Sequence, residues 1–167
     1  TSPSDLDQGD LPTSFYNGQQ QLFLVGADGE DTDEFDEMIV VHEWGHFFED
    51  TLSRSDSIGG SHSFGAVLDK RVAFGEGFAT AIAGMALDNP IYCDTSWLGA
   101  NQSGFDINLE EEFIQGEGWY SEDSIIEILY DLWDTDNDGA DNDSIGFGPI
   151  YNVMRGNQVT SPAFTSI

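Results

Sequence analysis

Apolar residues recur at the spacing of an α-helix in three parts of the chain, and each recurrence predicts a helix that buries one face. The first predicted helix follows a group of acids, with Thr32 or Asp33 as its cap. The second begins near Ala73, and the third follows Ser121. The positions expected to face the core are Met38, Val41, Gly45, Phe48 and Leu52 in the first helix, Phe74, Phe78, Ala81, Ile82 and Met85 in the second, and Ile125, Ile126, Leu129, Leu132 and Trp133 in the third.

The segments outside these helices have weaker patterns. Residues 19–25 favour strand and stop at Gly26, which predicts either an edge strand that could hold an extended peptide or a plain core strand. Residues 94–105 show no strong periodicity, and residues 106–115 are predicted to form a short acidic helix. Together these elements predict an α+β fold in which a small sheet packs against helices.

One stretch of the first predicted helix has the pattern H-E-x-x-H. His42 and His46 are four residues apart, so on a helix both imidazoles stand on one face and can bind one zinc ion about 2.0–2.1 Å away. Glu43 lies one position round, where its carboxylate can reach a water beside the metal as a general base does. The same residues could form an ordinary polar helix face, but the apolar stripe beside them favours zinc.

A hydrolytic zinc site needs a third protein ligand and an open position. The residues after His46 lack the Gly and third His of the metzincins, which leaves His62 and Glu76 as candidates. Glu76 opens the second predicted helix, whereas His62 lies in a Gly/Ser-rich loop, and we expect Glu76 to be the ligand. His62 is then either a loop residue bonded to backbone or a cleft residue that polarises a substrate carbonyl.

The sequence H-E-W-G-H followed by G-E-G-F-A resembles the gluzincin metallopeptidases, the thermolysin-like and fungalysin-like branch of the zincins, over about residues 20–90. The resemblance implies a zincin-like fold, in which a small sheet with an edge strand packs on two zinc-ligand helices and a further helical part follows. It also implies that His42, His46 and Glu76 bind Zn²⁺ and that Glu43 activates water for hydrolysis of a peptide bond.

The chain departs from this family in two places. The segment between the two helices is longer than in thermolysin, with a Gly/Ser-rich insertion at residues 53–65. Thr80 stands where thermolysin-like relatives have an Asp that orients a ligand histidine. A hydroxyl can accept the same N–H hydrogen bond, although it orients the ring less strongly than a carboxylate.

The residue that would stabilise an oxyanion is less clearly marked. In an ungapped comparison with the same family, the histidine with this role falls on Tyr120, and Tyr130 lies further along the third predicted helix. A phenol can donate a hydrogen bond to an oxyanion as an imidazole does, and the alternative is that each ring only packs. The expected donors are therefore Tyr120 or, failing that, His62 or Tyr130.

An acidic loop at residues 134–145 follows the third helix. It has Asp at positions one, three and five and Gly139 at six, as in the first half of an EF-hand calcium loop. Ile145 replaces the bidentate Glu at position twelve, so the loop is either an incomplete calcium site or a solvated acidic turn. The candidate Ca²⁺ ligands are Asp134, Asp136, Asp138, Asp141 and Asp143.

Composition and charge narrow the class of protein. The chain has 167 residues, 39% of them hydrophobic, which suits one domain with its own core. It contains no apolar run of about 18 residues that could span a membrane. The formal net charge of −28 makes nucleic acid an unsuitable partner, because phosphates would be repelled. This charge suits a calcium-rich extracellular setting or a high-salt habitat.

We therefore expect one zinc peptidase domain over residues 1–167, with its core at about 19–133. Because no Met or signal peptide opens the chain, we expect a piece of a longer secreted protein. Its expected cofactors are Zn²⁺ and Ca²⁺, its partner is a peptide or protein substrate, and its oligomeric state has no marker in the sequence. Two alternatives stay open: a non-catalytic zincin-like binding module, and a calcium-dependent extracellular domain in which the histidine pair is incidental.

Overall fold

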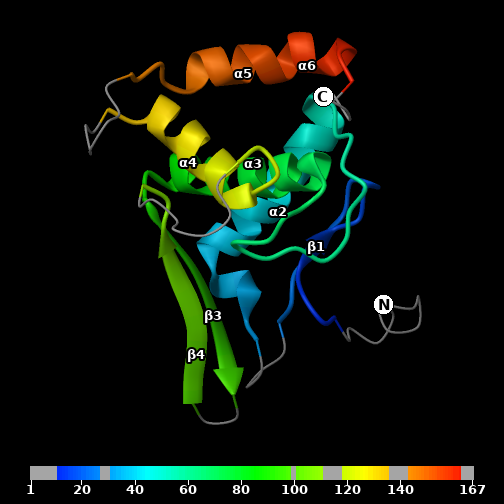
Figure 1. Cartoon of the computed structure of the whole chain (residues 1–167). Helices are drawn as coiled ribbons and strands as arrows, with labels where there is room; N and C mark the ends of the chain where they lie inside the picture. Colours follow the sequence, from blue (N-terminus) through cyan, green and yellow to red (C-terminus); the bar gives the residue numbers. More distant parts are fainter. Residues whose placement is uncertain (1–10, 27–30, 99–100, 111–117, 136–142, 163–167) are drawn as a thin grey trace.

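The computed structural model describes residues 11–26, 31–98, 101–110, 118–135 and 143–162. Its architecture is α+β: the helices gather at one end, and an antiparallel hairpin extends away from them (Figure 1). No helix among these residues is both long enough and apolar enough to cross a bilayer. In chain order the elements are β1 (Phe15–Tyr16), β2 (Leu22–Phe23), η1 (Asp33–Phe35), α2 (Glu37–Leu52), α3 (Lys70–Leu87), β3 (Ile91–Leu98), β4 (Asn101–Asn108), α4 (Glu122–Trp133), α5 (Phe147–Arg155) and α6 (Asn157–Thr160).

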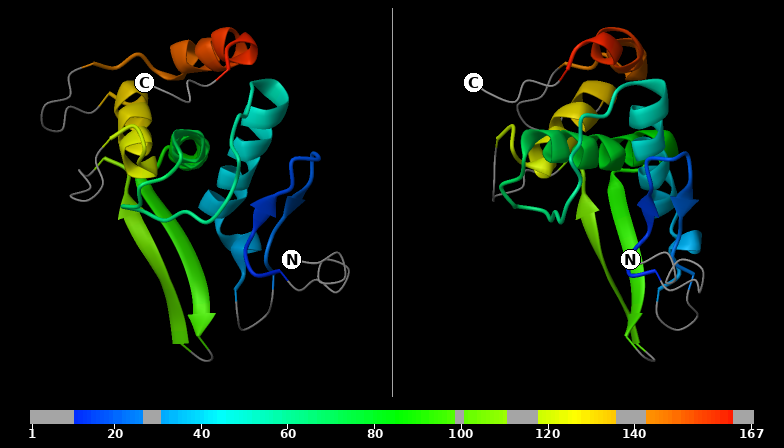
Figure 2. Two further views of the ribbon diagram at one scale, coloured as in Figure 1. Left: turned by 45° about the vertical axis from the view of Figure 1, so that its right-hand side comes forward. Right: turned by 90° about the vertical axis from the view of Figure 1, so that its right-hand side faces the viewer.

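The three helices predicted from the apolar pattern are all present. α3 lies between α2 and α4 (Figure 2), and most of its residues are buried because it has neighbours on both sides. α3 begins at Lys70, earlier than predicted, since the Asp69 carboxylate accepts a hydrogen bond from the backbone N–H of Arg71. The predicted caps Thr32 and Asp33 are wrong for α2: they belong to the 3-10 turn η1, and α2 starts after Asp36.

Two glycines allow the helices to approach closely. A Cβ atom on Gly45 of α2 would lie 2.8 Å from the Cα of Ala79 on α3. A Cβ atom on Gly77 of α3 would lie 2.6 Å from the Cβ of Ile125 on α4. Both distances are too short for a side chain, so these positions need glycine. Gly45 precedes His46 and Gly77 follows Glu76, so the close contacts fix the backbone beside candidate metal ligands.

The hydrophobic core lies among α2, α3 and α4, and α5 covers one end of it (Figure 1). Side chains from the hairpin and the residue that follows it reach the core as well. Its most buried members are Met38, Ile39, Phe48, Phe78, Ala81, Ile82, Ala83, Met85, Tyr92, Leu109, Ile126, Tyr130, Ile150 and Met154. The core thus forms a rigid support under the face of α2 that carries the two histidines.

The strands differ from the sequence-based expectation. The predicted strand at residues 19–25 is reduced to β2, which pairs with β1 in a two-residue antiparallel ladder. The hairpin of β3 and β4, in register from Ile91↔Asn108 to Leu98↔Asn101, was not predicted. The predicted acidic helix is wrong at residues 106–108, which belong to β4; residues 111–115 lie outside the described residues. Many hairpin residues are exposed or half-buried, so no clear apolar alternation marks these strands.

Candidate metal centre

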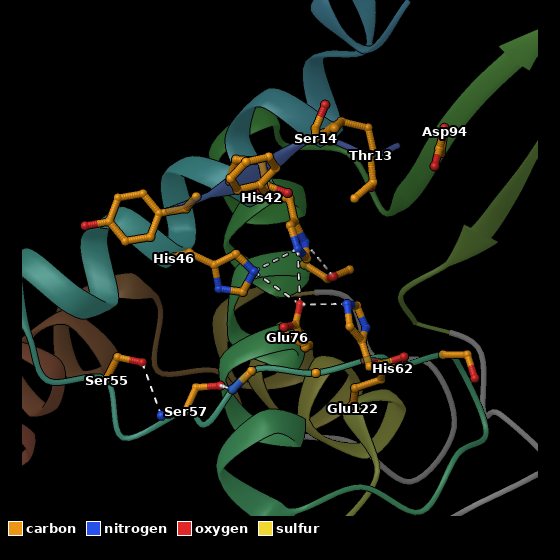
Figure 3. A pocket seen from close by; sticks show the side chains of 18 of the residues that line it. Thr13, Ser14, His42, His46, Ser55, Ser57, His62, Glu76, Asp94 and Glu122 are labelled. Carbon is orange, nitrogen blue, oxygen red and sulfur yellow. Dashed lines mark hydrogen bonds and ion pairs between the residues drawn. The ribbon is translucent and has the colours of Figure 1, made fainter. Parts of the chain in front are cut away.

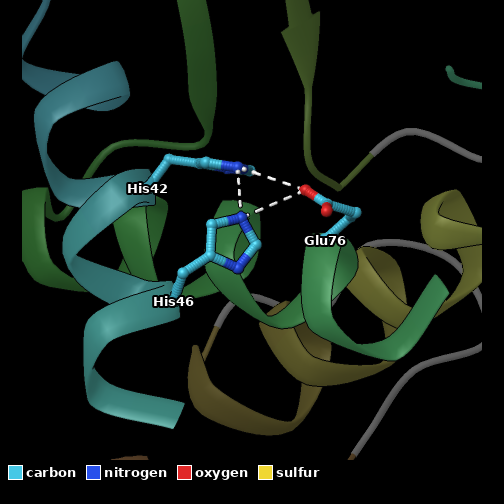
Figure 4. A group of neighbouring side chains, drawn as sticks. All are labelled: His42, His46 and Glu76. Atoms are coloured by element: carbon cyan, nitrogen blue, oxygen red, sulfur yellow. Dashed lines mark hydrogen bonds and ion pairs between the residues drawn. The ribbon is translucent and has the colours of Figure 1, made fainter. Parts of the chain in front are cut away.

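His42 and His46 stand on the same face of α2, as their spacing predicts (Figure 4). Their Nε2 atoms are 3.1 Å apart, and the two rings meet edge to face. Glu76, in the second turn of α3, points its Oε2 atom at both rings, 3.4 Å from His42 Nε2 and 3.1 Å from His46 Nε2. We call His42, His46 and Glu76 the metal triad.

The spacing of these three atoms suits zinc. For bonds of about 2.0–2.1 Å in a tetrahedral site, two ligand atoms lie about 3.3 Å apart. The three separations in the metal triad are 3.1, 3.1 and 3.4 Å. Two imidazole nitrogens and one carboxylate oxygen are also the donor set of a zinc site that keeps one position open. The residues therefore fit a zinc ion without rearrangement of the backbone.

His42 is oriented by Thr80, one turn beyond Glu76 on α3. The Oγ1 atom of Thr80 lies 3.0 Å from His42 Nδ1, and both side chains are buried. A hydroxyl that accepts from Nδ1–H leaves Nε2 with its lone pair toward Glu76 and available to a metal. Thr80 thus contacts His42 from the position at which thermolysin-like relatives have the orienting Asp.

Within the metal triad, His46 and Glu76 each stabilise the charged form of the other, as the directions of their pKa shifts show. Burial alone would raise the pKa of Glu76, but hydrogen bonds from His42 and His46 hold that pKa well below its usual range. Burial would lower the pKa of His46, whereas its hydrogen bond and charge interaction with Glu76 raise it. Glu76 is therefore ionised over the physiological pH range, as a carboxylate ligand must be.

Glu43 lies in the same cavity as the metal triad. Its side chain is buried, and its Oε2 atom has no hydrogen-bond partner among the described residues. An unsatisfied buried carboxylate oxygen costs free energy unless a ligand or water completes it. Its place beside the metal triad is the one expected of a group that takes a proton from water.

His62 faces the metal triad from the opposite side of the cavity (Figure 3). It lies in the loop between α2 and α3, with Nε2 3.3 Å from the same Oε2 atom of Glu76. Its Nδ1 atom lies 2.9 Å from Oε2 of Glu122, the first residue of α4. The hydrogen bond with Glu122 is the main reason that the pKa of His62 is raised, against the effect of burial. The His62 side chain is therefore fixed in the cavity by Glu76 and Glu122, rather than bonded to backbone in the loop.

The two tyrosines considered as oxyanion donors do not reach this cavity. Tyr120 is not among its lining residues; its backbone carbonyl accepts from Leu68 N, and its ring meets Trp119. Tyr130 is 2% exposed and packs in the hydrophobic core against Trp133. This arrangement does not support the prediction for either tyrosine: Tyr120 precedes α4, and α4 presents its first residue to the cavity and its later aromatic side chain to the core.

Two lining residues that sequence reasoning did not select are Glu122 and Tyr92. Glu122 was seen only as an acid in the first turn of the third helix, and no local signal pairs it with His62, sixty positions earlier. Tyr92 lies on β3 and meets the His42 ring edge on, with centroids 6.1 Å apart. The cavity has a volume of about 850 Å³ and is also lined by Phe15 and Tyr16 of β1. This is enough room for a segment of peptide.

The acidic loop that follows α4 is described only at its ends. Asp134 and Asp143 are described, whereas Asp136, Asp138 and Asp141 lie outside the described residues. The backbone N–H groups of Ile145 and Gly146 both donate to the Leu132 carbonyl, so the two ends of the loop lie together. Calcium binding by this loop stays a prediction.

The sequence family gives an independent view of the chain. The family model described as the Mycolysin C-terminal domain matches residues 6–158, nearly the whole chain and all of the metal triad. The chain belongs to this family. No match was found among curated proteins or among solved structures.

This membership relates the chain to thermolysin-like metallopeptidases, in line with the resemblance of the two helices, and such domains occur in secreted peptidases. The description names the C-terminal part of the peptidase. The match by itself therefore favours a non-catalytic module over a catalytic domain, which is one of the alternatives that the sequence left open.

Proposed function

We propose that the chain is a zinc-dependent peptidase domain of zincin type that hydrolyses peptide bonds, and that it acts outside the cell. The observation that carries this proposal is the metal triad, with its ligand atoms 3.1–3.4 Å apart beside the buried carboxylate of Glu43. Family membership supports the extracellular setting through its link to secreted peptidases.

Each residue of the cavity then has a defined task. A zinc ion held by the metal triad would supply a Lewis acid that polarises the peptide carbonyl and makes a water more acidic. Glu43 accepts a proton from the attacking water at its free Oε2 atom and later donates it to the leaving amine. His62, whose Nδ1 atom is bonded to Glu122, donates a hydrogen bond from Nε2 to the carbonyl oxygen as negative charge develops there, and the raised pKa of His62 favours the form that can donate from both ring nitrogens. Thr80 keeps His42 in the tautomer that can bind metal.

The walls of the cavity suit an extended peptide. β1 contributes Phe15 and Tyr16 to the lining, whereas neither residue of its partner β2 is among the lining residues. An extended segment can bind such a strand through main-chain hydrogen bonds and place alternate side chains in the cavity. In this arrangement β1 takes the role that the sequence suggested for residues 19–25.

Replacement of Glu43 by Gln tests the proposal. The wild type is expected to hold about one zinc per chain, by metal analysis, and to cleave a quenched-fluorescence peptide library. Glu43→Gln should keep its zinc and lose roughly 10²–10⁴ in rate. Glu37→Gln is the matched control, because it makes the same change on the exposed first turn of α2. Peptide hydrolysis that survives in Glu43→Gln would reject this mechanism.

A second candidate function is a closed zinc site in a non-catalytic module. It is favoured by the family description and by one distance: His62 Nε2 lies only 3.3 Å from the Glu76 oxygen that the other two histidines share. If His62 moved in as a fourth ligand, the site would have no position for water and would be structural.

The change His62→Ala separates the two candidates. In a peptidase, the zinc affinity stays near that of the wild type and the rate falls roughly 10²–10³-fold, as for loss of an oxyanion donor. In a closed site, the zinc affinity falls as much as it does in Glu76→Ala, and neither protein hydrolyses peptides. Zinc titration against a competing chelator and the peptide assay distinguish these results.

A further inference from the structure

Three carboxylates gather beside the cavity, away from the metal triad. Asp33 opens η1, Asp31 lies two residues before it, and Asp94 lies on β3, yet one oxygen of each is within 4.8 Å of the others. We call these residues the carboxylate cluster. Asp33 and Asp94 also line the cavity that contains His42 and Glu43, and Figure 3 shows Asp94 apart from His42, His46 and Glu76.

The backbone around the carboxylate cluster is held by other bonds. Asp31 and Ser96 form an isolated antiparallel bridge. The backbone N–H of Thr95 donates to a carboxylate oxygen of Asp36 at 2.8 Å, and its hydroxyl donates to the same carboxylate. These contacts bring η1 against β3 and force three like charges together, although such charges repel one another when they are close.

The most buried member of the cluster has an unsatisfied oxygen. Asp33 is 5% exposed; its Oδ2 atom accepts from the Ser14 hydroxyl, but its Oδ1 atom has no partner among the described residues. Burial first, and then the nearby charges of Asp31 and Asp94, raise the pKa of Asp33 to about 6. A buried carboxylate that is ionised at neutral pH needs a positive partner.

The chain itself does not provide that partner. It has only four Lys and Arg residues, and all four lie in the described part of the structure. Each is engaged elsewhere: Arg54 with Asp56, Arg71 with Asp69, Lys70 over the Trp119 ring, and Arg155 with the Leu52 carbonyl. No Lys or Arg side chain therefore offsets these charges, and a cation from solution can do so.

We propose that Asp31, Asp33 and Asp94 bind one calcium ion, which joins the segment before α2 to β3. An all-oxygen set suits a hard cation rather than zinc. Calcium binds oxygens at about 2.3–2.6 Å, so two of its ligand atoms can be up to about 4.6–5.2 Å apart, which the observed span allows. Magnesium needs a tighter octahedron at about 2.0–2.1 Å. The free Oδ1 of Asp33 becomes a ligand atom, and the ion fixes one wall of the cavity.

This site is independent of the zinc proposal, and its test measures calcium binding alone. The full chain is titrated with CaCl₂ and, separately, MgCl₂ by calorimetry. Asp136 and Asp138 are replaced by Asn in every protein, so that calcium in the acidic loop does not contribute. Asp94→Asn and Asp31→Asn should each weaken calcium binding roughly tenfold or more, because affinity follows the charge of the ligands. Magnesium should bind more weakly than calcium.

Asp106→Asn is the matched control. Asp106 lies on β4 next to Phe105, the partner of Asp94 in the ladder, so its side chain is on the other face of the hairpin. Asp106→Asn should bind calcium as tightly as the parent protein, which carries only the Asn replacements of Asp136 and Asp138. The proposal is overturned if Asp31→Asn and Asp94→Asn keep the parent affinity, or if Asp106→Asn loses as much as they do. Far-ultraviolet circular dichroism and urea unfolding show whether each variant is folded. If Asp94→Asn does not fold, the Asp31→Asn variant provides the test, because Asp31 is only half-buried.

Discussion

The metal triad and the carboxylate cluster lie on one cavity but are built in opposite ways. The metal triad consists of two imidazoles and one carboxylate on α2 and α3, helices that meet closely at Gly45, and its ligand atoms lie 3.1–3.4 Å apart. The carboxylate cluster joins a 3-10 turn to a strand and contains only like charges. Helix packing therefore forms the first site before any ion binds, whereas the second depends on its ion to offset repulsion.

The largest expected effect is the loss of zinc affinity when Glu76 is removed. Glu76→Ala removes one of three zinc ligands and should lower zinc affinity roughly a hundred- to a thousandfold, about 3–4 kcal/mol if the binding free energy of a zinc site is shared among its ligands. Calcium binding at the carboxylate cluster should not change. Competition with a zinc chelator and calcium calorimetry on the same sample measure both.

Glu37→Gln again serves as the control for a lost acid that touches neither site. Equal losses of zinc and calcium in Glu76→Ala would mean that the two sites are not independent and that the variant has lost its fold. A small loss of zinc alone would mean that Glu76 is not a ligand.

The sequence could predict which residues form the metal triad because most of its determinants are local. An apolar stripe at helical spacing predicts α2 and the face on which His42 and His46 stand, and a second stripe predicts α3 with Glu76 near its start. Only the approach of the two helices is long-range. Gly45 was visible as an unexplained glycine in a helix, and its reason, the Cα of Ala79, is visible only in the structure.

The carboxylate cluster and the pair of His62 with Glu122 could not be predicted in this way. Each joins residues about sixty positions apart, and neither has a spacing that local geometry repeats. The hairpin that carries Asp94 was missed because its exposed strands lack apolar alternation. The ungapped comparison placed the oxyanion donor first on Tyr120 because it assumed that the residue at the matching position would also reach the matching place, whereas we propose His62, the second of the predicted donors.

Glu49, beside the metal triad, is a second buried acid whose pKa is raised, as that of Asp33 is in the carboxylate cluster. Glu49 is 2% exposed, and its Oε2 atom accepts a hydrogen bond from the Ser55 hydroxyl. Burial raises the pKa of Glu49 from 4.5 to about 7. The folded metal-free protein therefore keeps this proton to higher pH than the unfolded chain does, and the stabilisation is lost as pH rises from about 4.5 through 7.

Glu49→Gln should remove this pH dependence. In metal-free protein the variant should match the wild type near pH 5 and be more stable by about 2 kcal/mol at pH 8, because Gln keeps an acceptor for Ser55 without a buried charge. Urea unfolding at both pH values, with chelator present, measures the difference. An equal difference at pH 5 and pH 8 would show that packing rather than ionisation separates the two proteins.

The smallest predicted effect concerns the residue that orients His42. Thr80→Val keeps the branched shape at a site that is 3% exposed but removes the acceptor 3.0 Å from His42 Nδ1. Zinc affinity should fall about tenfold, or 1.4 kcal/mol, at the lower end of the range for such orienting partners because a hydroxyl holds an imidazole less firmly than a carboxylate. Calcium binding should be unchanged. Thr80→Ser keeps the hydroxyl and should keep the wild-type affinity for zinc. Wild-type zinc affinity in Thr80→Val together with a loss in Thr80→Ser would mean that the Thr80 methyl group, through packing, holds His42 in place.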